Sequence, residues 1–578
     1  MSTFALRAGR RALFRRPSAT VAVSLTVSVL VLGVGLLLPI TQVVSTAISP
    51  EGQLALERLL TNPVNQQTVL NTMVLGVVVA AVGVSIAFLF AYVQARTAVP
   101  FKRVLHVIAI LPVVSPPFAL ATSVIVLFGR NGVISKGIFG VPYDIYGLDG
   151  LTLVLALSFF PVVYLSLLGM LQRLDPSLDA AATNLGAGPV RIFRTITLPL
   201  MVPGLASGFL LLFVESIADL ANPLVLGGNY TVLSTRAYLA ITGEFDVVSG
   251  AVYSLSLLVP ALLVFALQKY WVERKSVATV TGKPSGTVKL TSGPLSWIAY
   301  GAVVFIAALI VTIYATIVIG AFTRVPGVNN ELTLDHFEFV LAGIGSQAMI
   351  DTTILAIIAA PIAATLGIVI GWLVTKKLSK VPAAALDFLS MLGIAVPGTV
   401  LGIGVLLAFR PDNLVGGVTV IPSLAGGSAL AGGAVAIVLV LVLRSLPAAV
   451  RTSTGALRQI HGNLDEASAS LGAGEAATFA RVTVPLIAPA IVAGLTFAVA
   501  RSMTTLSPIV FLTTPDIKIM TSQILAEVDA GRFGNAFAYC VVLMMIVLTL
   551  IGIVQLINRI APRRARREPS KIVKDLVP

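Results

Sequence analysis

The sequence predicts an all-α membrane protein with about twelve transmembrane helices in two parallel six-helix repeats. Three observations support this prediction: an apolar composition, twelve separate apolar runs and one internal repeat. Of the 578 residues, 57% are hydrophobic and only 11% are charged, whereas about a quarter of the residues in a soluble domain are charged. This composition excludes a water-soluble protein of this size.

The apolar residues form runs that are each long enough to cross a bilayer, which takes about 20 residues. We expect the spans at 20–48, 68–95, 104–128, 151–171, 203–222, 250–268, 297–322, 350–375, 386–409, 428–447, 487–512 and 536–557. We interpret the first run as a retained helix and not as a signal peptide, because it is long enough to span and no small-residue cleavage site follows it.

The distribution of Lys and Arg along the sequence predicts how the chain is oriented in the membrane. If the N-terminus lies inside, the cytoplasmic segments hold most of the 39 Lys and Arg residues. The opposite side then holds only Arg58, Arg130, Lys136, Arg236, Arg324, Arg410, Lys518 and Arg532. This bias follows the positive-inside rule and places both termini in the cytoplasm. The net charge of +14 is therefore explained by topology, and we expect no nucleic-acid partner.

An internal repeat divides the chain into two halves. The segment 178–199 recurs as 464–485. The corresponding positions are Asp179 and Asp465, Gly186 and Gly472, Pro199 and Pro485, Asn71-Thr72 and Asp351-Thr352, and Pro117 and Pro397. Six spans separate the two copies, so both halves enter the membrane the same way up.

The predicted organisation is a first half at 1–275, a cytoplasmic linker at 276–294, a second half at 295–560 and a basic cytoplasmic tail at 561–578. The linker consists mostly of small polar residues, Gly and Pro, which is typical of a flexible connection. The tail is rich in Arg and Lys, and we expect it to lie on anionic membrane lipid.

We call 178–199 the first repeated loop and 464–485 the second repeated loop. Each begins with an Ala-rich, helix-favouring stretch that has an acidic residue in its first turn. A glycine then ends this helix, and a proline opens the next membrane helix. We expect a short helix that lies across the membrane face and presents small side chains to another surface.

These loops resemble the EAA signature of ABC importer permeases, in which E-A-A is followed by three residues, Gly, nine residues and I-x-L-P. The resemblance implies a MetI-like, type I importer permease fold in which each loop is a coupling helix that docks on an ATP-hydrolysing subunit. The first loop has Ala180 where the family often has Glu, so its docking contacts would rely on Asp179. The implied coupling residues are Asp179, Ala180, Ala181, Gly186 and Pro199 in the first loop and Asp465, Glu466, Ala467, Gly472 and Pro485 in the second.

The resemblance also implies the partners and the location. They are two copies of an ABC ATPase and an extracytoplasmic solute-binding protein, in a bacterial cytoplasmic (inner) membrane. The chain contains no G-x-x-x-x-G-K-[ST] phosphate loop, so we expect ATP to be bound by the partner subunit and this chain to be no enzyme. We predict no catalytic residue, no cofactor and no metal site, since the three histidines stand alone and there is one cysteine.

The fused two-half organisation and the segment 221–228 (ANPLVLGG) are most similar to permeases of the ferric-iron type. Permeases for 2-aminoethylphosphonate, sugar phosphate, thiamine or polyamine share this similarity and stay open as alternatives. An alternative class is an ion-coupled secondary transporter with parallel six-helix repeats. Such a transporter would need coupling carboxylates within its spans and would not need the duplicated loops.

Polar residues inside the spans are costly and usually face the interior of a helix bundle. The predicted translocation-path residues are Glu215, Asp219, Asn222, Arg501 and Ser502. Glu215 corresponds to Arg501 in the repeat, so two packed halves could bring opposite charges together near the centre. A structural ion pair is the alternative reading. Pro116-Pro117 and Pro397-Gly398 are expected to kink the third span of each half.

Overall fold

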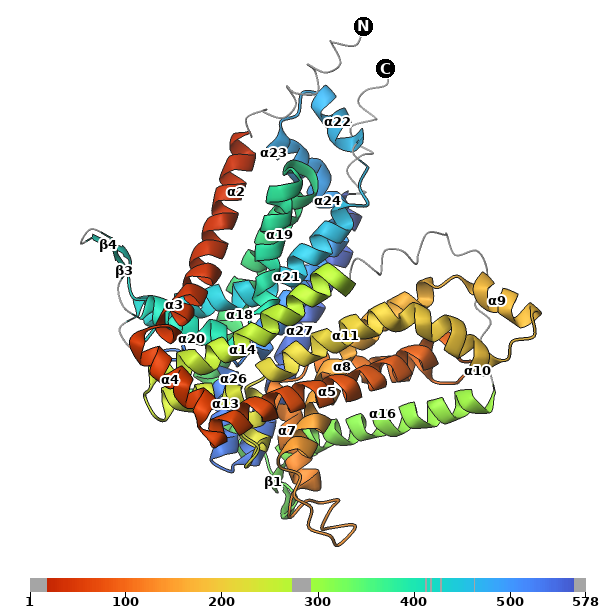
Figure 1. Ribbon diagram of the computed structural model, residues 1–578, viewed down its shortest axis with the longest axis vertical. Coiled ribbons are helices and arrows are strands. Elements are labelled where there is room, and N and C mark those ends of the chain that lie inside the picture. Colours follow the sequence, from red (N-terminus) through yellow and green to blue (C-terminus); the bar gives the residue numbers. More distant parts are fainter. Residues whose placement is uncertain are drawn as a thin grey trace.

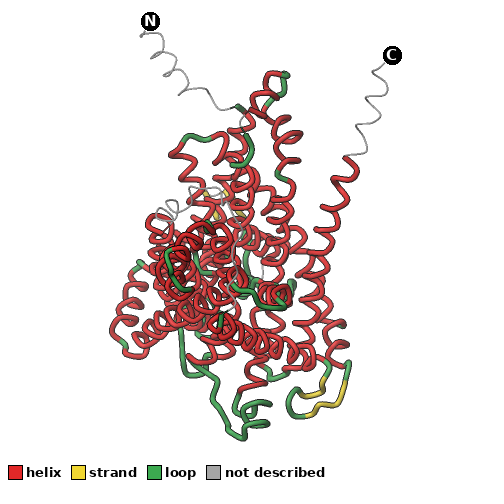
Figure 2. Tube along the Cα trace, turned by 90° about the vertical axis from the view of Figure 1, so that its right-hand side faces the viewer, coloured by secondary structure: helices red, strands yellow, loops and turns green. Residues whose placement is uncertain are grey.

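The computed structural model describes residues 18–272, 293–410, 413–415, 418–426, 429–461 and 463–565. Helices make up most of this part, and the strands form two short antiparallel hairpins, β1–β2 and β3–β4 (Figures 1 and 2). Most of the predicted linker, 276–294, and of the predicted basic tail, 561–578, lies outside the described residues.

The regular elements in the described part of the first half are all helical and are connected by loops such as 129–147. They are α2 (Ala19–Leu32), η2 (Gly33–Leu37), α3 (Leu38–Ala47), α4 (Pro50–Thr61), α5 (Pro63–Arg96), α6 (Lys102–Ile110), η3 (Leu111–Val113), α7 (Pro117–Phe128), α8 (Leu148–Arg173), α9 (Pro176–Asn184), α10 (Pro189–Ile192), η4 (Phe193–Thr197), α11 (Leu198–Ala218), α12 (Ala221–Leu226), α13 (Leu233–Thr242), α14 (Val247–Leu267) and η5 (Gln268–Val272).

The second half repeats this order and adds the two hairpins. Its elements are α16 (Pro294–Ala321), β1 (Thr323–Val325), β2 (Asn329–Leu332), α17 (Asp335–Leu341), α18 (Gly343–Trp372), η7 (Leu373–Lys377), α19 (Lys380–Ala395), α20 (Gly398–Phe409), β3 (Asn413–Val415), β4 (Val418–Ile421), η8 (Leu430–Gly433), α21 (Ala434–Leu457), α22 (Asn463–Ser470), α23 (Glu475–Thr478), η9 (Phe479–Thr483), α24 (Val484–Leu486), α25 (Ala488–Thr504), α26 (Met520–Asp529) and α27 (Phe533–Ala565).

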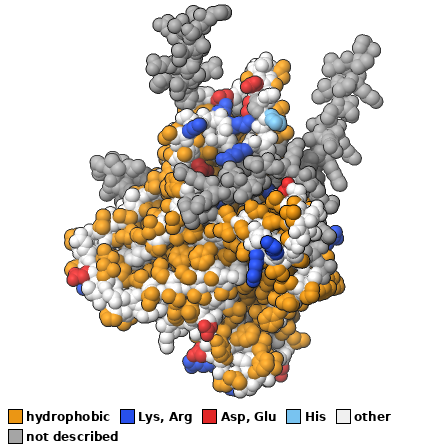
Figure 3. Space-filling view, turned by 45° about the vertical axis from the view of Figure 1, so that its right-hand side comes forward, with side chains coloured by type: hydrophobic (Ala, Val, Ile, Leu, Met, Phe, Trp, Pro, Cys, Tyr) orange, Lys and Arg blue, Asp and Glu red, His pale blue; other side chains and the backbone are white. Residues whose placement is uncertain are grey.

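Within the described ranges, nine helices are long and apolar enough to cross a membrane, and three further helix pairs pass the same test but are bent. Counting each bent pair as one span gives up to twelve crossings, one for each predicted run. A broad band of apolar side chains covers the visible face, and charged side chains lie mostly towards its two ends (Figure 3). The predicted all-α membrane fold of about twelve helices is confirmed.

The third span of each half is sharply bent, as the proline pattern predicted. The bend is 107° in the first half and 104° between α19 and α20 in the second. Pro116 and Pro397 stand at the two breaks in extended conformation, with ψ of 150° and 141°. A proline in this conformation starts the next helix and cannot continue the previous one, because it has no N–H group to donate.

The predicted span 487–512 is wrong at its end, because α25 stops at Thr504. The apolar residues that follow form turns, and Leu506, Ile509 and Leu512 are buried. An added Cβ at Gly402 of α20 would lie 2.4 Å from the carbonyl oxygen of Pro508, so this segment packs directly on the helix. These residues are apolar because they pack within the protein and not because they cross the bilayer.

Equivalent hydrogen bonds occur at the positions that the repeat predicts. In the first half, the Leu233 N–H donates to Thr72 Oγ1 at 2.9 Å, and in the second the Met520 N–H donates to Thr352 Oγ1 at 2.9 Å. Both threonines are buried. Each bond ties the second long helix of a half to the segment after its fifth span, so the two halves share their internal architecture.

The two halves interlock. In the first half, α3 packs against α14 of its own half and against α20 of the other half. In the second half, α16 packs against α27 of its own half and against α7 of the other. Figure 1 shows α16, in green, beside α5 and α7, which come much earlier in the chain. The first span of each half therefore contacts the bent third span of the other.

Close packing between the halves makes Gly404 sensitive to substitution. A Cβ added there would lie 2.7 Å from the Pro39 carbonyl oxygen in α3, so the backbone would have to move. We expect Gly404→Ala to cost about 1–3 kcal/mol, as overpacking typically does, and to lower the midpoint of thermal unfolding in detergent. The matched control is Gly301→Ala in α16, where nothing lies within 4 Å of the added Cβ. Equal midpoints in the two variants would contradict close packing at this interface.

Candidate functional site

The two repeated loops follow the same backbone path. In the first, α9 ends before Gly186, and α10, η4 and α11 follow. In the second, α22 ends before Gly472, and α23, η9 and α24 follow. Figure 1 shows α9 and α22 at the margin of the molecule away from the hairpin β3–β4 and from β1. Both loops therefore lie on one face, and the hairpins lie on the other.

A glycine in left-handed conformation turns the chain in each loop. Gly186 and Gly472 both have φ of +80°. The turn is closed by a bond from the Ala187 N–H to the Ala182 carbonyl at 2.9 Å, and from the Ala473 N–H to the Ser468 carbonyl at 3.1 Å. This is the Schellman arrangement, which favours glycine because other residues have a Cβ that clashes in this region. The prediction that these glycines end the short helices is confirmed.

Each loop is anchored to the end of the second long helix of its half by an ion pair. Arg96, the last residue of α5, binds the carboxylate of Asp179. In the second half, Lys376 Nζ lies 3.1 Å from Asp465 Oδ2. The side chains of Arg96 and Lys376 are only 6% and 16% exposed. Asp179, which we expected to contact a partner, is thus bound within the chain, and Asp465 is held in the same way.

An aromatic contact accompanies each ion pair. The rings of Tyr92 and Phe193 lie 5.2 Å apart between centroids, and those of Trp372 and Phe479 lie 4.9 Å apart. These are equivalent positions, since Tyr92 and Trp372 each lie four residues before the anchoring cation. Aromatic pairs at such distances stabilise a contact beyond the area they bury. The loop and the helix end of each half are therefore held at two points.

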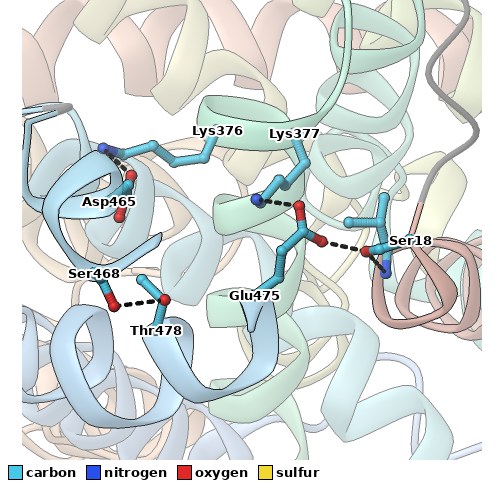
Figure 4. Close-up of polar contacts among 8 residues, drawn as sticks. Ser18, Lys376, Lys377, Asp465, Ser468, Glu475 and Thr478 are labelled. Carbon is cyan, nitrogen blue, oxygen red and sulfur yellow. Dashed lines mark hydrogen bonds and ion pairs between the residues drawn. The ribbon is translucent and has the colours of Figure 1, made fainter. Parts of the chain in front are cut away.

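The second repeated loop has further polar contacts (Figure 4). Lys377 Nζ lies 2.8 Å from Glu475 Oε1, and the hydroxyls of Ser468 and Thr478 are 2.8 Å apart. The first loop has Thr97, Pro189, Ala182 and Ile192 at the corresponding positions. Neither ion pair nor hydroxyl contact can form with those residues, so the two loops differ in how firmly they are held.

The remaining predicted coupling residues are on the outside or next to the following helix. Ala180, Ala181, Glu466 and Ala467 are exposed. Pro199 is near the start of α11 and Pro485 near the start of α24, and each follows a π-helical turn, η4 or η9. The neighbouring leucines of the two turns, Leu185 and Leu471, are each 88% exposed.

The predicted pair of opposite charges does meet between the halves. Arg501 Nη2 lies 3.7 Å from Glu215 Oε2, and the two side chains are 31% and 24% exposed. Glu215 comes from α11 of the first half and Arg501 from α25 of the second. Correspondence in the repeat was the signal that linked them.

The other predicted path residues make contacts within their own halves. Asp219 Oδ2 accepts bonds from the backbone N–H and the side-chain amide of Asn222, both at 2.9 Å. Ser502 is buried, and its hydroxyl lies 3.5 Å from that of Ser445 in α21. Asp219 and Asn222 therefore form one local unit at the end of α11, whereas Ser502 faces a neighbouring helix of its own half.

Arg444 is a structural residue that we did not predict as part of any site. Its Nη1 donates to the carbonyls of Gly393 and Val396, each at 3.1 Å. These carbonyls lie at the end of α19, where the bent span breaks and its last acceptors lack helical partners. A cation at a helix C-terminus is favourable. The sequence did hold one sign of such a role, because an arginine inside a predicted span is costly and usually has a specific partner.

Two interlocked six-helix halves, matched loops on one face and an ion pair between the halves define a multi-pass membrane transport permease. In the part of the chain that is described, no group of three His, Cys, Asp or Glu side chains is placed to hold a metal ion.

The chain belongs to the family described as binding-protein-dependent transport system inner membrane component, which matches residues 83–277 and 363–567, once in each half. Membership in this family of ABC importer permeases implies an ATP-hydrolysing partner and a solute-binding partner.

Similar proteins include permeases of ferric and molybdenum transport systems. The chain is 34% identical over 491 residues to the ferric transport system permease protein FbpB of Actinobacillus pleuropneumoniae, covering 82% of this chain and 68% of that protein. It is 33% identical over 473 residues to the putative ferric transport system permease protein FbpB 1 of Haemophilus influenzae, covering 80% and 72%. The molybdenum transport system permease protein ModB of Escherichia coli is 32% identical over 169 residues, 29% of this chain and 69% of that protein.

The left-handed glycines give a direct test of the loop geometry. We expect Gly472→Ala to cost about 1–2 kcal/mol, because alanine is strained at positive φ, and to speed amide hydrogen exchange at 468–474 by about 5–30-fold. Gly186→Ala is expected to do the same in the first loop. The matched controls are Gly188→Ala and Gly474→Ala, where φ is −73° and −70° and an added Cβ meets nothing within 4 Å. Equal exchange in variants and controls would show that the turn does not need glycine.

Proposed function

We propose that this chain is the permease subunit of an ABC importer, that a separate subunit hydrolyses the ATP, and that ferric iron is the cargo. One observation carries the proposal: the same loop, with the same turn and the same anchor, occurs once in each half on one face of the molecule. A pair of equivalent docking sites fits a motor made of two equivalent subunits. We therefore infer two copies of the ATPase, one under each repeated loop.

The exposed residues of the loops support their role as docking sites. Leu185 and Leu471 are largely exposed at equivalent positions. Ala181 and Ala467, each two residues after an anchoring carboxylate, are also exposed. Small side chains allow another surface to approach closely, and an exposed leucine offers an apolar contact to bury. Asp179 and Asp465 hold the loops in place from the inner side, which leaves the outer side for the partner.

The sequence supports the energy source and the orientation in this proposal. The chain contains no phosphate loop of the G-x-x-x-x-G-K-[ST] type, so the proposal assigns ATP binding to the partner. The proposal puts the repeated loops and both termini on the cytoplasmic side of a bacterial inner membrane, and the bias of Lys and Arg supports this orientation. The basic residues of 561–578 then lie where they can contact anionic lipid of the inner leaflet.

The assignment of ferric iron rests on two relatives whose names describe ferric transport permeases, each similar over at least 80% of this chain. In this proposal, an extracytoplasmic solute-binding protein captures the iron and delivers it to the outer face. The permease then passes it between the two halves as they move relative to each other.

The contact between Glu215 and Arg501 lies between the halves, and we place it on the translocation path. It forms in the structure described here and would have to break when the halves separate around a cargo. Asp219 and Asn222 lie within the next turns of the chain after Glu215, and Ser502 lies next to Arg501. These residues are the polar part of the path in this proposal.

We expect Glu215→Ala and Arg501→Ala each to lower uptake by about 5–30-fold, since each leaves a partly buried charge without its partner. The control is the charge-exchanged double variant, Glu215→Arg with Arg501→Glu, which restores the pair and is expected to recover much of the uptake. Uptake is measured in proteoliposomes and normalised to inserted protein. Wild-type uptake in both single variants would show that this ion pair is not part of the translocation path.

The proposed function itself is tested by uptake of radioactive iron into proteoliposomes that contain this chain with its cognate ATPase, in the presence of the binding protein. We expect uptake to require hydrolysable ATP and to persist when ionophores collapse ion gradients. Excess 2-aminoethylphosphonate, sugar phosphate, thiamine, polyamine or molybdate should not compete.

Two results would contradict this assignment in different ways. Uptake driven by an ion gradient without ATP would identify a secondary transporter. ATP-dependent uptake of one of the competing solutes, with none of iron, would retain the importer and replace the cargo.

A further inference from the structure

Glu475 connects three segments of the chain that are far apart in sequence (Figure 4). Its Oε1 binds Lys377 Nζ at 2.8 Å, and its Oε2 accepts a hydrogen bond from the Ser18 hydroxyl. Glu475 begins α23 in the second repeated loop, Lys377 ends η7, and Ser18 precedes α2. One carboxylate therefore joins the second repeated loop to α2, which begins the first of the described membrane helices.

Ser18 is well placed to pass a movement of the loop on to the helix. It is the N-cap residue of α2, and its Oγ accepts a bond from the Val21 N–H at 3.4 Å. The hydroxyl can donate to Glu475 and accept from the helix at the same time, since it is both a donor and an acceptor. A shift of Glu475 thus acts on the first turn of α2 directly.

Among the described residues, the positions of the first half that correspond to this contact cannot form it. Pro189 stands where the second loop has Glu475, Thr97 stands where it has Lys377, and Gly293 caps α16 where Ser18 caps α2. The Thr97 hydroxyl is instead bonded to the Val93 carbonyl at 2.6 Å. All three members of the contact are replaced by residues that cannot form it, so the difference between the loops lies in their chemistry.

The helix reached by this contact belongs to the first half and packs on the second half. α2 packs against α18, η7 and α19 of the second half, and α3, which continues the same span, packs against α14 and α20. The span α2–α3 therefore runs from the second repeated loop on one face to a contact with both halves further along. The first repeated loop acts on its own half through the anchor at α5 and through its continuation into α11.

We propose that Glu475 is a positioning residue that ties the second repeated loop to α2, so that the two loops transmit the motor's movement unequally. The second loop moves its own half and, through this polar contact, the span α2–α3 of the other half. The first loop acts on α16 of the other half through the packing of α5, and its residues at the corresponding positions cannot form such a polar contact. This inference rests on the proposed function, because it takes the repeated loops to be the docking sites of the ATPase. The contact is exposed, and exposed ion pairs contribute little to folding stability, so its loss is expected to affect coupling and not folding.

The test measures transported cargo per ATP hydrolysed in the proteoliposome assay, with the complete complex. Glu475→Gln removes the charge, and Ser18→Gly breaks the same contact from its other end while keeping an acceptable N-cap. We expect each to lower the cargo per ATP by about 2–5-fold, as a modest coupling free energy allows, with normal recruitment of the ATPase to the membrane. Ser18→Thr keeps the hydroxyl and is expected to behave as wild type.

A matched control lies outside both repeated loops. Thr549 is exposed in α27, and its hydroxyl donates to the Met545 carbonyl of the same helix at 2.7 Å. Thr549→Ala is expected to leave the cargo per ATP unchanged. If wild type transports with ATP, and both Glu475→Gln and Ser18→Gly transport as much cargo per ATP as wild type, the contact between Glu475 and Ser18 does not transmit movement. Absence of ATP-dependent uptake in wild type would instead contradict the proposed function.

Discussion

A cation at the end of the second long helix of each half holds a carboxylate in the first turn of the repeated loop, and the site depends on this interaction. Arg96 binds Asp179, and Lys376 binds Asp465. The cations are mostly buried, so a loop that lost its carboxylate would take the ion-pair partner from a buried charge, which is unfavourable. The loop therefore cannot rotate freely on the bundle. Any force applied to its outer side acts on the second helix and on the helix that follows the loop.

Duplication followed by divergence explains why opposite charges meet between the halves. Corresponding positions face each other across two related halves, and here they carry Glu215 and Arg501. Two identical halves would place like charges together at this point, which is unfavourable in a membrane. The same divergence appears at Asn71 and Asp351. Asn71 donates its amide to the Thr231 carbonyl, whereas Asp351 accepts from the Lys518 N–H. Both bonds join the second long helix of a half to the segment just before α13 or α26, but the helix side chain is the donor in the first half and the acceptor in the second.

Much of the fold was predictable because membrane helices leave a strong signal in the sequence. Apolar runs, the positive-inside bias, the repeat and the proline pairs gave the twelve spans, the two halves and the bent third spans. The end of α25 was not predictable from hydropathy, since residues 505–512 are as apolar as a span yet are buried by α20. The packing of α3 and α16 across the halves has no local signature, because each is simply an apolar helix.

The candidate site was predictable in part for the same reason. A spacing motif identified the loops and their glycines, and correspondence in the repeat identified Glu215 with Arg501. The anchors Arg96 and Lys376 look like ordinary positive-inside residues at helix ends, and Glu475 looks like an exposed acid. Their roles depend on segments about 80 to 460 residues away in the chain, and only the folded arrangement brings those together.

In the proposed importer, the repeated loops move when the partner binds and hydrolyses ATP. This movement can be measured as the distance between spin labels at Leu185→Cys and Leu471→Cys, by double electron–electron resonance on the complete complex. Both sites are 88% exposed, and the one native cysteine, Cys540, is buried. We expect the distance distribution to shift to shorter values when ATP binds and to return after hydrolysis. If a complex that transports gave the same distribution with and without ATP, the loops would not be the moving parts.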